Sequence, residues 1–205
     1  MVQKKFFLMA VMAVCALTAS AQKGEFHYTP HISFGYAHYS HDVDFGIFNI
    51  SIKHGIQGSV GADVEYMVSN SFGLSAGLDY NYYYFKGSDI TPQLKTEVTT
   101  SYSNLNLPIL AQYHFGNGFA LKAGLQPMFI LSMNVSLGMD GESIIDESST
   151  EDIKTVALAL PVGISYTFHT PITIDLRYNI PITKLNTDEH YKKISGVTLG
   201  IGYRF

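Results

Sequence analysis

The last twelve residues, Ile194–Phe205, read ISGVTLGIGYRF and alternate between two kinds of side chain. Glycine, threonine and arginine lie between bulky apolar residues that occupy every second position: Val197, Leu199, Ile201, Tyr203 and Phe205. A period of two residues is typical of a β-strand, whose successive side chains point to opposite faces. The chain therefore ends in a strand with one bulky apolar face and one face of small and polar residues.

The same alternation recurs along the chain, in segments about as long as a tilted strand needs to cross a bilayer. It predicts eight strands, at residues 31–39, 55–67, 72–84, 105–115, 119–137, 156–168, 172–182 and 197–205. The links between them alternate between short (68–70, 116–118, 169–171) and long (about 40–54, 87–98, 138–153, 184–193). An even number of strands with short turns on one side and long loops on the other is the plan of an antiparallel outer-membrane β-barrel. Both ends of the barrel domain then lie on the short-turn, periplasmic side.

Two pairs of similar segments support this plan. FGLSAGL at 72–78 resembles FALKAGL at 119–125, and LPILAQYHF at 107–115 resembles LPVGISYTF at 160–168. Each of these four segments lies directly beside a predicted periplasmic turn, as expected for a barrel that grew by duplication of a hairpin.

The distribution of charge between the two faces indicates which face meets lipid. Seven charged residues in strands share their face with glycine, serine and asparagine: Asp63, Glu65, Asp79, Lys122, Asp175, Arg177 and Arg204. Because the interior of an eight-stranded barrel is only wide enough for side chains, this face is predicted to point inward. Four acids and three bases are nearly balanced, so we expect ion pairs, with a charge-lined ion path as the alternative. In 119–137, simple alternation sends Phe129, Leu131, Met133 and Val135 toward lipid, and Ser132, Asn134 and Ser136 into the lumen.

Aromatic residues on the apolar face gather near the short turns and the carboxy terminus. This set is predicted to form a periplasmic aromatic girdle: Tyr66, Phe72, Tyr113, Phe115, Phe119, Tyr166, Phe168, Tyr203 and Phe205. A terminal aromatic residue also resembles the signal that barrel-insertion machinery reads, so this machinery is an expected partner. The alternative, a soluble β-sandwich, does not explain a glycine-and-charge face repeated in every strand.

The amino terminus predicts export. Lys4 and Lys5 precede an apolar run from Phe6 to Leu17, and Ala19-Ser20-Ala21 follows. This pattern is typical of a cleaved signal peptide at 1–21, which leaves a barrel domain at 22–205. Cys15, the only cysteine, leaves a lipoprotein as the alternative. A formal net charge of -4 gives no basic surface for nucleic acid.

Candidate chemistry is sparse. GLSAG at 73–77 fits a hydrolase pattern, but Ser75 lies within a predicted strand rather than on a sharp strand-to-helix turn. The weak metal candidates are His38, His41 and Asp42, with Asp44 and His54 nearby, and their spacing is not diagnostic. The acidic loop at 138–153 is best read as solvated, with a bridging cation as the alternative. We therefore expect no cofactor, no bound metal and no catalytic residue.

The segment YSNLNLPILAQYHFGNGFALKAGLQPMFIL at 102–131 resembles the signature of a Bacteroidetes outer-membrane β-barrel family described as porin-like or PorT-like. The matching residues are Leu107, Pro108, Ile109, Tyr113, Phe115, Gly116, Ala123 and Gly124. The resemblance implies a barrel in the outer membrane of a Gram-negative cell and, through some members, a link to secretion. It carries over no catalytic residue.

Together these observations predict a monomeric eight-stranded barrel surrounded by outer-membrane lipid. Its expected role is structural or interactive: it would support the envelope, or present loops to a surface ligand or a secretion partner. A narrow pore for ions or very small solutes is the alternative. A lipid-modifying enzyme that uses His38 and His41 is a more remote one.

Overall fold

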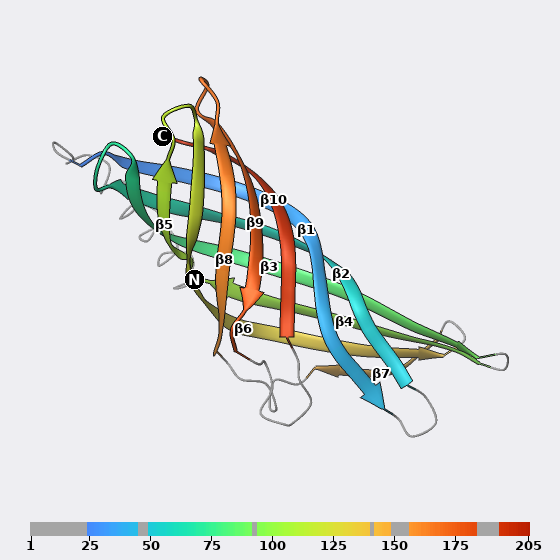
Figure 1. Cartoon of the computed structure of the whole chain (residues 1–205). Helices are drawn as coiled ribbons and strands as arrows, with labels where there is room; N and C mark the ends of the chain where they lie inside the picture. Colours follow the sequence, from blue (N-terminus) through green and yellow to red (C-terminus); the bar gives the residue numbers. More distant parts are fainter. Residues whose placement is uncertain (1–23, 45–48, 92–93, 140–141, 149–155, 184–192) are drawn as a thin grey trace, which may run out of the picture.

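The computed structural model describes residues 24–44, 49–91, 94–139, 142–148, 156–183 and 193–205. The predicted signal peptide at 1–21 lies outside these residues. The described strands are β1 (Phe26–Asp44), β2 (Asn49–Met67), β3 (Phe72–Thr91), β4 (Leu94–Asn106), β5 (Ile109–His114), β6 (Phe119–Met139), β7 (Glu142–Ser148), β8 (Val156–Thr167), β9 (Ile172–Pro181) and β10 (Lys193–Tyr203) (Figure 1). In the described part of the chain, no helix has the length and apolar character needed to cross a membrane.

The strands form one closed antiparallel ring. β1 pairs with β2 and β2 with β3, the pairing then passes through β4 and β5 to β6, β8, β9 and β10, and β10 pairs with β1. The closing ladder runs from His31 opposite Gly202 to Ser40 opposite Lys193. At its periplasmic end the Phe205 N–H donates to the Tyr28 carbonyl oxygen at 2.9 Å. The ring has eight positions, because β4 and β5 share one and β7 pairs only with β6, so the predicted eight-stranded barrel is confirmed.

The predicted strand at 105–115 is interrupted in its middle. β4 ends at Asn106 and β5 begins at Ile109, with Leu107 and Pro108 between them. Proline has no N–H to donate to a ladder, so a regular strand cannot continue through it unchanged. Two hydrogen bonds of 2.9 Å continue the pairing across this break. Leu107 N–H donates to the Pro127 carbonyl oxygen, and Gly77 N–H donates to the Pro108 carbonyl oxygen.

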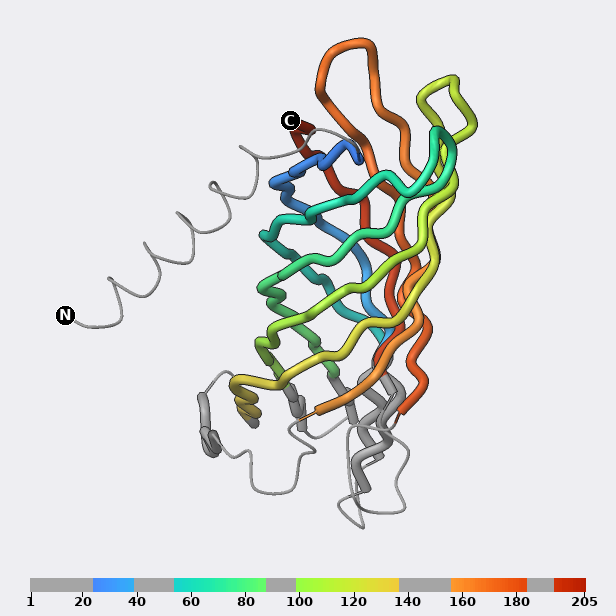
Figure 2. The backbone as a smooth tube through the Cα atoms, turned by 90° about the vertical axis from the view of Figure 1, so that its left-hand side faces the viewer, coloured from blue at the N-terminus to red at the C-terminus, as the bar shows by residue number. Residues whose placement is uncertain are grey.

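The barrel is much taller on one side than on the other. β1, β2, β3 and β6 contain 19, 19, 20 and 21 residues, whereas β9 and β10 contain 10 and 11. Three of the predicted long loops therefore begin as extensions of strands, with β7 pairing on β6 in the third. Figure 2 shows the three short turns and the carboxy terminus at one end of the ring, and Figure 1 shows the extended strands running to the other end.

The predicted inward and outward faces of β6 are wrong beyond Leu131. The β4–β6 register shifts between Ser103 and Asn104, where Asn104 pairs with Ile130 and Ser103 with Ser132. Leu131 is the extra residue of a β-bulge, and a one-residue insertion exchanges the faces that follow it. Met133 and Val135 consequently pack inside against the buried core, and Asn134 is exposed on the outer face.

Candidate functional site in the barrel interior

Inward-facing side chains from the strands fill the ring in layers. The layer nearest the periplasm centres on Glu65 of β2. Its carboxylate accepts a hydrogen bond from His114 Nε2 at 2.6 Å and one from Arg204 Nη2 at 3.0 Å. Nearby, Gln112 Nε2 donates to Ser75 Oγ at 2.8 Å. Strands β2, β3, β5 and the chain after β10 are thereby joined across the interior.

Arg177 of β9 is the centre of the next layer. Its guanidinium lies 3.3 Å from Asp175, 3.5 Å from Asp79 and 3.8 Å from Asp63, measured between nitrogen and carboxylate oxygen. Lys122 Nζ is 2.8 Å from the other oxygen of Asp175. Because buried charges are costly unless they are paired, this arrangement accounts for three carboxylates and two cations in a narrow interior.

His31 of β1 completes this central layer. Its Nε2 lies 3.1 Å from Asp79, and its Nδ1 lies 3.7 Å from Asp63. Two glycines make room for these carboxylates, because a methyl group at Gly61 or Gly77 would overlap the oxygens of Asp79 or Asp63. At Gly61 and Gly77 the glycine is thus required by the carboxylate beside it.

A set of buried amide side chains fills the next level of the interior, farther from the periplasm than the charged layer: Gln57, Asn81, Asn104, Asn106 and Gln126. A central cavity of about 30 Å³ is lined by residues of this set and of the charged layer. A cavity needs about 10–15 Å³ of such volume to hold one water molecule. The space in this part of the lumen is therefore sufficient for a few waters and not for a wide channel.

Stacked aromatic rings fill the interior farther from the periplasm. The rings of Tyr83 and Tyr102 lie 4.6 Å apart at an interplanar angle of 5°, and Phe85 stacks on Tyr102 at 5.9 Å and 10°. Around them pack Ala37, Met128, Ala157, Ala159, Ile194, Ile130, Met133 and Val135. Phe85 has 0% of its surface exposed. We call this set the aromatic plug, and it is a closely packed, mostly apolar core inside the barrel.

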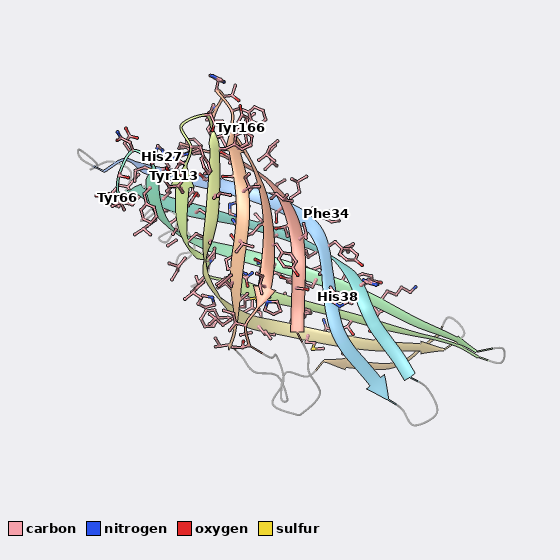
Figure 3. The ribbon with its side chains drawn as sticks, viewed as in Figure 1. His27, Phe34, His38, Tyr66, Tyr113 and Tyr166 are labelled. Carbon is pink, nitrogen blue, oxygen red and sulfur yellow. The ribbon has the colours of Figure 1, made fainter. Side chains whose placement is uncertain are left out.

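The nine residues proposed for the girdle lie on the outer face at the short-turn end, where Figure 3 labels Tyr66, Tyr113 and Tyr166. Several pack ring against ring. The distance between ring centroids is 4.7 Å for Phe119 and Tyr166, 4.8 Å for Tyr166 and Phe168, and 4.6 Å for Tyr203 and Phe205. Phe26 and Tyr28 of β1 join the set through Tyr66 and Phe205. Their role as an interfacial anchor remains a prediction.

The weak metal candidates are only partly described. His38 lies on the outer face opposite His54 of β2, with 5.4 Å between the ring centroids (Figure 3). The side chains of His41 and Asp42 lie outside the described part of the structure. Among described residues, His31, Asp63 and Asp79 place ligand atoms within 4.8 Å of one another. Arg177 already supplies a positive charge to both carboxylates, and it would repel a second cation.

Sequence reasoning missed His31 and His114 as partners of the lumen carboxylates. Their signal was available, because both fall on the polar phase of their strands. It also missed the aromatic plug. The signal there was the run Asn81–Phe85, NYYYF, where aromatic residues occupy both phases and the alternation of polarity is lost.

The closed ring, the filled interior and the apolar exterior define a small membrane-spanning β-barrel. Residues 19–187 match the family model described as "Outer membrane protein beta-barrel domain". The chain therefore belongs to this family, and the protein is located in the outer membrane. The Bacteroidetes and PorT-like character inferred from sequence remains a prediction.

Solved structures of outer-membrane proteins resemble the chain in fold. Ail of Yersinia pestis is 18% identical, with 90% of this chain and 100% of Ail covered and a TM-score of 0.48. Neisserial surface protein A is 14% identical, with coverage of 90% and 100% and a TM-score of 0.42. The N-terminal barrel of Pseudomonas aeruginosa OprF is 14% identical, with coverage of 89% and 100% and a TM-score of 0.32. A search of the curated proteins finds no significant match. At these scores, the assignment rests on the strand ladder and the family model.

Proposed function

We propose that the protein is a closed structural barrel that supports strand extensions outside the outer membrane, where they meet a surface ligand or a protein partner. The observation that carries this proposal is the aromatic plug above the ion-paired layer. Ions crossing the lumen would have to pass Arg177 and its carboxylates and then the stacked rings of Tyr83, Tyr102 and Phe85. A closely packed and mostly apolar layer offers few groups to replace the hydration shell of an ion, so it opposes conduction.

The extensions favour an interactive role over a purely mechanical one. β1, β2, β3 and β6 are about twice as long as the 9–11 residues that a tilted strand uses to cross a bilayer. Ordered strands beyond the membrane add nothing to the span itself. They offer a rigid base for the segments that connect them, and binding residues are often carried on loops held by a rigid scaffold.

The partner is proposed to be a macromolecule or ligand at the cell surface, and a secretion component is one candidate because of the PorT-like resemblance. The proposal includes no catalytic step. We also propose a monomer, since the described ring is closed and its strands need no second chain to complete the ladder.

Single-channel conductance of the protein in a planar bilayer tests the closed barrel. We expect no reproducible current steps from the wild type, and small steps from a Tyr83→Ala/Phe85→Ala/Tyr102→Ala variant, which lacks the plug rings. Tyr80→Ala/Tyr82→Ala, on the outer face of the same strand, is the matched control and should stay silent.

Heat-modifiable migration must first show that each variant is folded. Reproducible wild-type steps whose ion selectivity changes in Arg177→Ala would contradict the proposal and support the narrow pore.

A further inference from the structure

The lipid-facing surface of β1, β2 and β3 contains a patch of large side chains around one glycine. Three cross-strand rows lie one above another: Ile32–Val60–Tyr80, Phe34–Gly58–Tyr82 and Tyr36–Ile56–Tyr84. All except Gly58 are large side chains exposed on the outer face. The missing side chain at Gly58 leaves a groove of about 500 Å³ between aromatic walls. We call it the Gly58 groove.

The depth of the groove places it in the outer leaflet. Phe72 lies at the periplasmic end of β3, and Tyr84 is twelve residues farther along the strand. At about 3.3 Å per residue and a tilt of about 40°, this corresponds to about 30 Å along the membrane normal, the thickness of a hydrocarbon core. Tyr84 therefore lies at the outer boundary of the apolar layer, and Tyr82 and Tyr80 lie about 5 and 10 Å below it. An apolar groove at this depth is covered by acyl chains.

A row of nitrogen-bearing side chains lies directly beyond the groove. His38 faces His54 across β1 and β2, and Lys86 is the next outward residue of β3 after Tyr84. All three are exposed. The hydroxyl of Tyr36 is hydrogen-bonded to Nδ1 of His54. When that hydroxyl donates, the neutral imidazole carries its hydrogen on Nε2, which then donates outward. The row thus combines N–H donors with one permanent positive charge at the level of lipid headgroups.

We propose that the Gly58 groove and the row His38–His54–Lys86 together bind a phosphorylated lipid of the outer leaflet. One acyl chain lies in the groove between Phe34 and Tyr82. A phosphate of the headgroup accepts hydrogen bonds from the histidines and pairs with Lys86. This pairing of an apolar slot with donors at one fixed height matches the two chemically different ends of such a lipid. The site is separate from the lumen and from the strand extensions of the proposed function.

Native mass spectrometry of the detergent-solubilised protein tests the site with two probes, diphosphorylated lipid A and its phosphate-free form, which carry the same acyl chains. We expect the wild type to retain the phosphorylated probe about tenfold more than the phosphate-free one, because at least one hydrogen bond from a charged group is involved. His38→Gln/His54→Gln/Lys86→Gln should remove that preference. Gly58→Leu, which fills the groove, should reduce retention of both probes.

The matched control is Ala123→Leu, which enlarges an exposed residue on β6 away from the groove and should behave as wild type. Gly58→Leu should fold, because a Cβ at Gly58 meets no atom closer than 3.8 Å. Equal retention of both probes by the wild type would overturn the proposal. So would unchanged retention in Gly58→Leu, or displacement of the lipid by millimolar inorganic phosphate, which would indicate a site for the anion alone.

Discussion

The periplasmic part of the barrel and its outer part fill the same cylinder with opposite chemistry. Near the periplasm the interior contains Arg177, Lys122 and their carboxylates, and the exterior is leucine, isoleucine and aromatic rings. Beyond Leu131 the interior contains Met133 and the stacked rings of the aromatic plug, while Asn134 faces outward. The interior therefore changes from paired charges near the periplasm to stacked rings toward the outer end.

The difference follows from the medium outside. Lipid accepts only apolar side chains, so the polar residues of a spanning strand must face inward and pair there. Toward the outer boundary of the membrane, a polar side chain such as Asn134 can face outward, and apolar side chains such as Met133 stabilise the interior by burial. Two local features change the interior from polar to apolar. One is the β-bulge in β6, and the other is the run of aromatic residues on both faces of β3.

The largest effect is expected from a change in the charged layer. Arg177→Ala leaves Asp63, Asp79 and Asp175 with much less positive charge, and we expect the free energy of unfolding to fall by about 3–5 kcal/mol. Urea unfolding followed by circular dichroism measures it. Arg177→Met combined with Asp63→Asn and Asp79→Asn, which removes charges of both signs, should regain much of that loss. An unchanged unfolding midpoint in Arg177→Ala would show that the layer is solvated rather than paired.

A smaller effect separates the two readings of β6. Met133→Ala should lower the free energy of unfolding by about 2–3 kcal/mol, because it removes a side chain packed against the aromatic plug. Asn134→Ala, its exposed neighbour, should change it by less than about 0.5 kcal/mol. The same urea titration compares them. The reverse order would restore the uninterrupted alternation and rule out the bulge at Leu131.

The third test measures which residues are exposed to water rather than how stable the barrel is. Cysteines placed at Leu125 or Ile164, on the lipid-facing surface, should react slowly with a charged maleimide in liposomes, whereas a cysteine at Asn134 should react at the rate of an exposed thiol. The mature chain has no other cysteine if the predicted signal peptide is removed. Equal rates at Leu125 and Asn134 would mean that the boundary between the two parts is misplaced.

Much of the fold could be predicted from local pattern. The phase of alternation in β3, in β9 and in the last segment, 197–205, places Asp79, Arg177 and Arg204 on the inner face, and the structure has them there. The bulge could not be predicted, because it depends on pairing between Ser103 and Ser132, which lie in different strands. Pro108 itself can be read from the sequence as a residue that interrupts a strand. The hydrogen bonds of Gly77 and Leu107, which carry the ring past it, cannot be read there.

For the interior, the sequence determined the inventory of charges and their face, since both follow from residue type and a period of two. Only the tertiary structure decided that Asp175 is shared by Arg177 and Lys122, that Glu65 joins His114 to Arg204, and that the rings of Tyr83 and Tyr102 stack. These contacts join residues up to 139 positions apart, and they depend on ring closure and strand register. A local pattern contains no information about distance across the barrel.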